Sequence, residues 1–166
     1  MRTIAERTSC PREYRAVTAE SSVACPDCRR QGVIVRARTV KALLTQEALA
    51  RLGVGVHRLC ESSGCPVVYY DDRGGVYHRQ DVHVDVWHKE PFGSRMICYC
   101  FGETEQTIRM EFEKRGQSEA VERVRAHIDL GRCACDVRNP RGVCCLDDLA
   151  AAVEQVGAVF GVARLP

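Results

Sequence analysis

Residues 25–32 read CPDCRRQG and residues 60–65 read CESSGC, and these two turns decide the fold of the first half of the chain. They offer two pairs of thiols, Cys25-x2-Cys28 and Cys60-x4-Cys65, with 31 residues between the pairs. Four thiolates suit a tetrahedral zinc ion, so the spacing predicts a closed structural zinc site. The alternatives are free core cysteines or two disulfides. A catalytic zinc ion is disfavoured, because no open position or acid–base group accompanies the thiols.

The composition narrows the class of protein. The chain has 166 residues, of which 45% are hydrophobic and 28% are charged, and this excludes a disordered or fibrous protein. The net charge of +2 is too small for a nucleic-acid partner. No stretch is apolar for long enough to span a membrane, and the start MRTIAERTSC lacks the apolar run of a secretory signal. We therefore expect a cytoplasmic protein whose 11 cysteines bind metal rather than form disulfides.

Hydrophobic patterning predicts a small mixed α/β unit over residues 25–92, after an N-terminal extension at 1–24. Strands are expected within GVIVRAR, VHRLC and VVYY, and a helix is expected within VKALLTQEALARL at 40–52. The alternation in DVHVDVW predicts a further strand, with Val82, Val84 and Val86 on one face.

Residues 93–157 instead show the periodicity of helices. Thr104 is a candidate N-cap for EQTIRMEFEKR, Gly116 ends that segment, and a second helix is expected in EAVERVRAHIDL. A last helix is expected to begin near Cys144, and residues 158–166 to form a C-terminal tail. The predicted fold class is therefore α+β, with a zinc-stabilised α/β unit followed by a helical unit of about three helices.

A second set of cysteines lies in this helical unit, as Cys98-x-Cys100, Cys133-x-Cys135 and Cys144-Cys145. A two-thiol hook before a helix, with later thiols some 30–45 residues away, is typical of a [2Fe–2S] site, which needs four thiolates. Helix N-termini near these thiols would favour the negative charge of such a cluster. The alternative is a second zinc site.

Four segments in the same order carry a resemblance to a known family: CPDCRRQG, LCESSGCPVVYY, ICYCFGETEQTI and CDVRNPRGVCCLDDL. Over roughly residues 24–150, the chain resembles the N-terminal domain of CopZ-type copper chaperones, which combines zinc with a [2Fe–2S] cluster. The second half is also similar to bacterioferritin-associated ferredoxins (BFD-like domains), which open with a Cys-x-Cys hook.

The resemblance implies two ligand sets. Its zinc ligands are Cys25, Cys28, Cys60 and Cys65, and its cluster ligands are Cys98, Cys100, Cys135 and Cys145. Cys135 matches the CopZ-type motif because it lies four residues before Asn139, and nine residues separate it from Cys145. Cys133 is the alternative to Cys135, because its gap of 32 residues from Cys100 suits the ferredoxin pattern. Cys10 lies outside every motif and is expected to be a free thiol.

The resemblance also implies a function: metallochaperone-like handling of copper or another soft metal, with the cluster as a one-electron centre for a cupric reductase-like activity. Cys133 and Cys144 are then a hypothetical transient copper site. The expected partners are a copper-transporting ATPase, a redox partner or a separate copper-binding protein. The last is expected because full-length CopZ chaperones continue into a copper-binding domain that this sequence, ending at Pro166, does not show.

Two other functions stay open at this point. One is a [2Fe–2S] electron carrier or regulatory redox partner without copper binding, and the other is a double-zinc adaptor module. Arg132, Arg138 and Arg141 surround the predicted cluster loop. They either tune the cluster, dock an acidic partner, or simply offset the charge of the cluster in a solvated loop.

Overall fold

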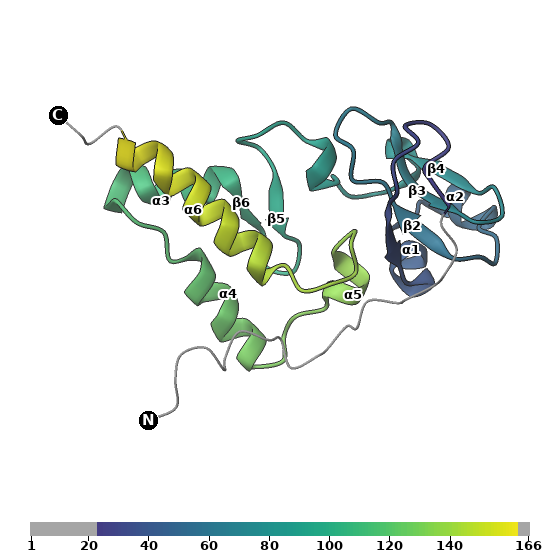
Figure 1. The fold of residues 1–166 in the computed structure, drawn as a ribbon. Coiled ribbons are helices and arrows are strands. Elements are labelled where there is room, and N and C mark those ends of the chain that lie inside the picture. The colour runs from purple at the N-terminus through teal and green to yellow at the C-terminus, as the bar shows by residue number, and fades with distance from the viewer. Residues whose placement is uncertain (1–22, 163–166) are drawn as a thin grey trace, which may run out of the picture.

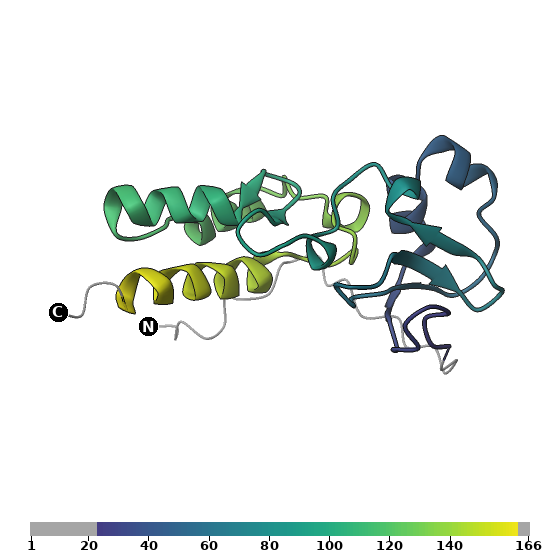
Figure 2. The same ribbon diagram turned by 90° about the horizontal axis from the view of Figure 1, so that it is seen from above.

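A computed structural model describes residues 23–162, which form an antiparallel sheet at one end and a group of helices at the other (Figures 1 and 2). The predicted α+β class is confirmed. Most of the expected N-terminal extension, including Cys10, lies outside the described residues. Within residues 23–162, no helix is both long enough and apolar enough to cross a membrane.

The sheet has four antiparallel strands in the order β1 (Val33–Val35), β2 (His57–Leu59), β3 (Val67–Asp71) and β4 (Val76–His78). All five residues of β3 are buried, because both faces of the sheet are covered. One face packs on side chains of α1 (Ala37–Leu43) and α2 (Gln46–Ala50). The other face packs on the two cysteine turns.

Two predicted elements of this half were wrong in detail. The expected helix at 40–52 is broken at Leu44, and Thr45 starts α2 by accepting a hydrogen bond from the Ala48 N–H at 3.3 Å. The strand expected in DVHVDVW does not form within the described chain. An isolated bridge joins Val82 to Leu44, and the 3₁₀ helices η2 (Arg79–Asp81) and η3 (Trp87–Lys89) lie at either end of this segment. Segment 81–83 pairs with the break between α1 and α2, so it cannot extend the sheet.

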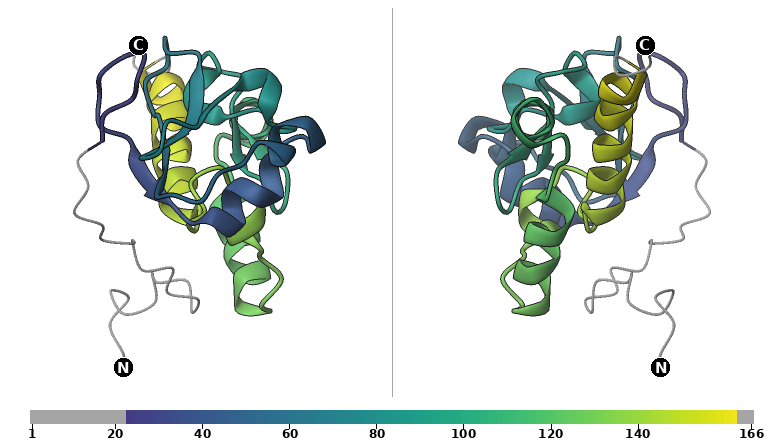
Figure 3. Two further views of the ribbon diagram at one scale, coloured as in Figure 1. Left: turned by 90° about the vertical axis from the view of Figure 1, so that its right-hand side faces the viewer. Right: turned by 90° about the vertical axis from the view of Figure 1, so that its left-hand side faces the viewer.

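The second half begins with the short hairpin β5 (Met96–Cys98) and β6 (Glu103–Thr104). Helices α3 (Glu105–Arg115), α4 (Ala120–Asp129), α5 (Cys135–Arg138) and α6 (Leu146–Val162) follow. Their apolar faces enclose a core that includes Ile108, Val124, Ile128, Leu149 and Val156. In the end-on views of Figure 3, α4 extends in light green beyond the rest of the described chain.

The ends of α3 follow the sequence prediction. The Thr104 hydroxyl accepts a hydrogen bond from the Thr107 N–H at 3.0 Å, and Gly116 ends the helix in the left-handed conformation with φ 76°. The end of α6 does not follow it, because residues 158–162, expected as tail, continue the helix. Phe160 stacks on Phe112 at 5.7 Å between ring centroids, and this contact anchors the last turns. The short α5 also makes four helices where about three were predicted.

Candidate metal centres

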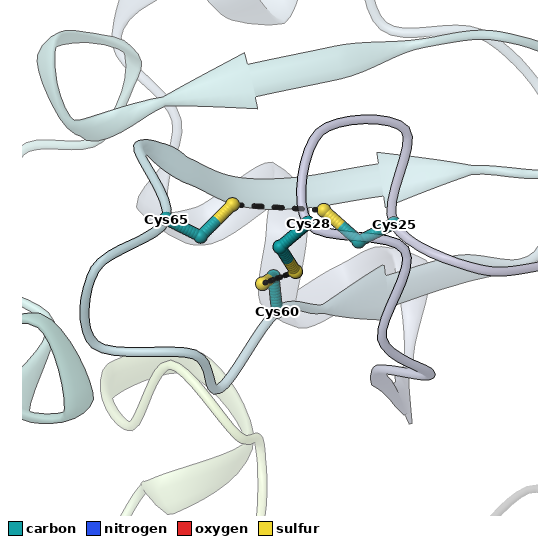
Figure 4. Close-up of side chains that lie close together, drawn as sticks. All are labelled: Cys25, Cys28, Cys60 and Cys65. Carbon is teal, nitrogen blue, oxygen red and sulfur yellow. Dashed lines mark hydrogen bonds between the residues drawn. The ribbon is translucent and has the colours of Figure 1, made fainter.

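The four cysteines of the two turns lie together in the structure (Figure 4). Their Sγ atoms are all within 4.8 Å of one another. The Sγ atoms of Cys25 and Cys65 are 3.7 Å apart, and those of Cys28 and Cys60 are 3.6 Å apart. A zinc–sulfur bond of about 2.3 Å gives a tetrahedron whose edge is about 3.8 Å, so this arrangement fits one zinc ion. Within residues 23–162, no other group of three or more potential ligands lies this close.

Backbone hydrogen bonds shape both turns. In the first turn, the Cys25 N–H donates to the Arg30 carbonyl at 2.9 Å, and Arg29 takes a left-handed conformation with φ 60°. In the second turn, the Cys65 N–H donates to the Ser62 carbonyl at 3.2 Å. Each turn therefore holds its two thiols in place through the main chain.

Gly32 lets the first turn approach the sheet. A Cβ atom at this position would lie 2.3 Å from the carbonyl oxygen of Leu59, a contact that no side chain tolerates. The Gly32 N–H donates to the Tyr70 hydroxyl at 2.8 Å, and that hydroxyl donates to the Val23 carbonyl at 3.1 Å. The close approach brings Cys25 and Cys28 over the face of the sheet that carries the second turn.

Polar neighbours favour the thiolate form of one cysteine of this site, Cys28. The Oγ of Ser62 lies 3.4 Å from the Sγ of Cys28, and together with the Arg30 N–H it lowers the pKa of Cys28 to about 6. Burial instead raises the pKa of Cys65. Lys89 is 5% exposed, and its Nζ donates to the Ser62 carbonyl at 2.6 Å, which places a positive charge beside the second turn. The sequence analysis missed Lys89, since it lies 24 residues beyond Cys65 with no motif around it.

The second set of thiols also meets, in the core of the helical half. Cys98, Cys135 and Cys145 are at most 2% exposed, and Cys100 is half-buried. The Sγ atoms of Cys100 and Cys135 lie 3.8 Å apart, and a further hydrogen bond joins Cys98 to Cys145. Cys145 also contacts Cys135, so the four thiols form one connected group.

The thiols of this group differ in pKa. Hydrogen bonds from Cys135 and Cys98 lower the pKa of Cys145 to about 4, while the bond to Cys145 raises the pKa of Cys98. The contact with Cys135 lowers the pKa of Cys100 to about 7, with help from the Ala134 N–H, which donates to the Cys100 Sγ at 3.2 Å. The pKa values of Cys145 and Cys100 therefore lie below the ordinary value of a thiol.

The two other cysteines of the predicted loop are close neighbours of this group. Cys133 is buried in the same core, and Cys144 is half-buried with a hydrogen bond to Cys135. Cys135 thus has contacts with three of the predicted site cysteines. The structure brings all six cysteines of the second set into one region.

Two buried carboxylates hold the Cys98–Cys100 hook in place. Glu103 accepts two hydrogen bonds from the Arg123 guanidinium of α4, at 2.8 and 3.0 Å. Glu105 accepts from the Arg95 Nε at 2.7 Å and from the Gly93 N–H at 2.6 Å. The first pair ties the hook end of the β5–β6 hairpin to α4, and the second joins the two open ends of the hairpin to each other.

The loop that carries Cys135 is seated on the first half of the molecule. The Thr39 hydroxyl of α1 donates to the Asp136 carbonyl at 2.7 Å, and the Tyr69 hydroxyl of β3 donates to the Pro140 carbonyl at 2.7 Å. Both bonds are buried. Gly142, at φ 69°, lies so close to Thr39 that a Cβ atom there would be 2.6 Å from the Thr39 hydroxyl. The sheet that holds the first four thiols thus supports the loop that holds part of the second group.

Arg141 links the same two regions through charge. Its Nε lies 3.2 Å from the carboxylate of Glu61, which follows Cys60, and its Nη1 lies 3.2 Å from Asp148 of α6. His88 also contacts Glu61, with 3.2 Å between Nε2 and Oε1. Of the three arginines singled out from the sequence, Arg141 therefore forms ion pairs within the protein.

Comparisons with known proteins agree with the first site. Residues 22–83 match the model of the zf_CopZ family, described as a zinc binding domain. Over 78% of this chain and 96% of the other, the structure is similar to the X-ray structure of the Archaeoglobus fulgidus CopZ N-terminal domain, at a TM-score of 0.63 and 29% sequence identity. Among curated proteins, no sequence matches significantly. These findings support the expectation of a CopZ-type domain that binds zinc.

Proposed function

We propose that this protein handles copper or another soft metal, with one structural zinc ion and one [2Fe–2S] cluster as its resident metal groups. The observation that carries the proposal is the second group of thiols. Four cysteines from three separate segments converge in a buried core, apart from the four cysteines that fit zinc. Metal ions are bound by the thiolate form of cysteine, and the lowered pKa values of Cys145 and Cys100 favour that form.

The donor chemistry supports zinc at the first site. Cys25, Cys28, Cys60 and Cys65 would hold the ion, since four sulfur atoms at tetrahedral spacing leave no open position for a substrate. This makes the site structural. Lys89 and the N–H groups of the turns offset the negative charge of the four thiolates.

The donor chemistry of the second group supports two irons. Cys98 is hydrogen-bonded to Cys145, Cys145 contacts Cys135, and Cys135 contacts Cys100, so the four thiols lie in one connected group. A [2Fe–2S] cluster takes two thiolates on each iron. Four ligands of a two-iron core need not all be as close as those of a single ion, which accounts for the looser grouping of these sulfurs. Cys133 lies in the same core and is the alternative ligand. We choose Cys135 because it contacts both Cys100 and Cys145.

A [2Fe–2S] cluster supplies one-electron redox chemistry when it is bound. Copper is the substrate in this proposal, and reduction of Cu(II) to Cu(I) takes one electron and gives the form that thiolates prefer. Cys133 and Cys144 lie beside the proposed ligands and would offer sulfur to that ion. The similarity of the second half to bacterioferritin-associated ferredoxins stays a prediction. It favours the second candidate, an electron carrier without copper.

Protein purified without oxygen is expected to be red-brown and to contain two irons and one zinc per chain. The measurement is a visible absorption spectrum with metal analysis by mass spectrometry. A colourless protein with two zinc ions would contradict the cluster and leave the double-zinc adaptor. A protein with no zinc would contradict the first site.

Copper titration then separates the two iron–sulfur candidates. The variant Cys133→Ser/Cys144→Ser is expected to lose about one equivalent of bound Cu(I), because two neighbouring thiolates suit this soft ion. Bound copper is measured by competition with a chromophoric Cu(I) chelator. The matched control is the wild-type protein at the same iron content. Equal copper binding in both proteins, with the iron retained, would contradict a copper site and favour the electron carrier.

A further inference from the structure

We propose that the surface around Cys100 is a docking face for an acidic one-electron carrier protein. This inference rests on the proposed cluster, and it adds where and with what kind of partner electrons are exchanged. Of the four proposed cluster ligands, three are at most 2% exposed, whereas Cys100 is half-buried. The shortest way from the cluster to solvent therefore passes the Cys100 side of the molecule.

Residues from the hook, α4, the α4–α5 loop and α5 form a continuous surface on this side, which we name the hook face: Cys100, Phe101, His127, Arg132 and Arg138. The Phe101 and His127 rings stack at 4.4 Å between centroids. The Arg132 guanidinium lies 3.4 Å from the His127 Nδ1, and the Arg138 guanidinium donates to the Cys100 carbonyl at 3.5 Å. The Arg138 contact joins α5 to the hook, while the Arg132 contact joins the α4–α5 loop to the His127 ring.

The hook face carries positive charge that no carboxylate neutralises within the described chain. Neither Arg132 nor Arg138 forms an ion pair there, and both residues are exposed. Asp136, the acid of α5, is buried and paired with Arg38 at 2.9 Å. Asp129 at the end of α4 is the remaining exposed acid nearby in sequence, and the two arginines outnumber it. Arg141, by contrast, forms ion pairs with Glu61 and Asp148.

The apolar part of the hook face fits a protein better than a small ion. The half-buried Phe101 ring stacks on His127, the residue that Arg132 contacts, and Leu130, two residues before Arg132, is 64% exposed. A protein interface combines an apolar or aromatic centre with a charged rim, and charges at the rim steer the partner and set the dependence on salt. A positive rim at the exposed ligand therefore selects a partner with an acidic surface.

The test measures binding of flavodoxin, an acidic one-electron carrier, as the probe. Titration calorimetry on the metal-loaded protein is done at low and at physiological ionic strength. The wild-type protein is expected to bind at low salt and to weaken as salt rises. Arg132→Glu/Arg138→Glu is expected to weaken binding about tenfold or more. The control Arg73→Glu/Lys114→Glu makes the same charge change at exposed sites elsewhere and is expected to stay within about twofold.

Equal weakening by both double variants, or no binding by the wild-type protein at low salt, would overturn the docking face. The iron content and visible spectrum of each protein are measured alongside. A wild-type protein without iron would contradict the proposed function, whatever the result of the binding measurement. Retained iron with weaker binding in Arg132→Glu/Arg138→Glu alone would support the docking face.

Discussion

Cys60→Ser is expected to lose zinc and to unfold the first half of the protein. Zinc binding to a structural cysteine site contributes roughly 10–16 kcal/mol. A whole domain is stable by only about 5–15 kcal/mol, so this half should not survive the loss. The expected result is a zinc content near zero and fast hydrogen exchange in β2 and β3. Metal analysis and hydrogen-exchange mass spectrometry make the measurement.

Ser63→Ala is the matched control for this prediction, because Ser63 is an exposed residue of the same turn. It should keep one zinc ion and slow exchange in β3. Cys60→Ser should also weaken the second site, because Thr39 and Tyr69 then no longer hold the loop of Cys135. A Cys60→Ser protein with stoichiometric zinc and a protected β3 would contradict the prediction.

Cys135→Ala is expected to abolish the iron–sulfur absorption, whereas Cys133→Ala is expected to keep it. Cys135 contacts both Cys100 and Cys145, so its loss removes one of the four thiolates that the cluster needs. We expect the iron content to fall about tenfold or more in Cys135→Ala. Iron analysis and visible absorption of proteins purified without oxygen measure the difference.

The two variants control each other, because each removes one buried thiol from the same core two residues apart. Both lose similar packing, so a shared loss of stability cannot explain a difference in iron. Retained iron in Cys135→Ala with lost iron in Cys133→Ala would reverse the assignment. Loss of iron in both variants would also contradict it, unless the zinc content and the exchange of α6 showed that Cys133→Ala had unfolded.

The four-thiol group of the first site could be predicted from the sequence because its turns are local. Cys25 and Cys28 share one turn and Cys60 and Cys65 share another, so short spacings already report two pairs of thiols. The Thr104 cap and the Gly116 end of α3 were predicted for the same reason, since both depend on neighbours in sequence. The match of residues 22–83 to a zinc binding domain agrees with this local signal.

Elements that depend on distant contacts could not be predicted in this way. The alternation of Val82, Val84 and Val86 is typical of a strand, yet segment 81–83 pairs with the break between α1 and α2. The last turns of α6 depend on Phe160 meeting Phe112 across the helical core. Lys89 reaches the second turn from a part of the chain that no motif marks.

The cysteine spacings by themselves determined that this protein has a four-thiol site suited to zinc and a second set of six thiols with a Cys-x-Cys hook. Only the tertiary structure decided which of the six meet, and that the loop of Cys135 rests on α1 and β3 through Thr39 and Tyr69. It also decided that Arg141 turns inward while Arg132 and Arg138 stay exposed at the hook. The physical reason is the distance along the sequence over which the interactions act. A turn is set by hydrogen bonds within a few residues, whereas burial and charge at a site depend on segments that only folding brings together.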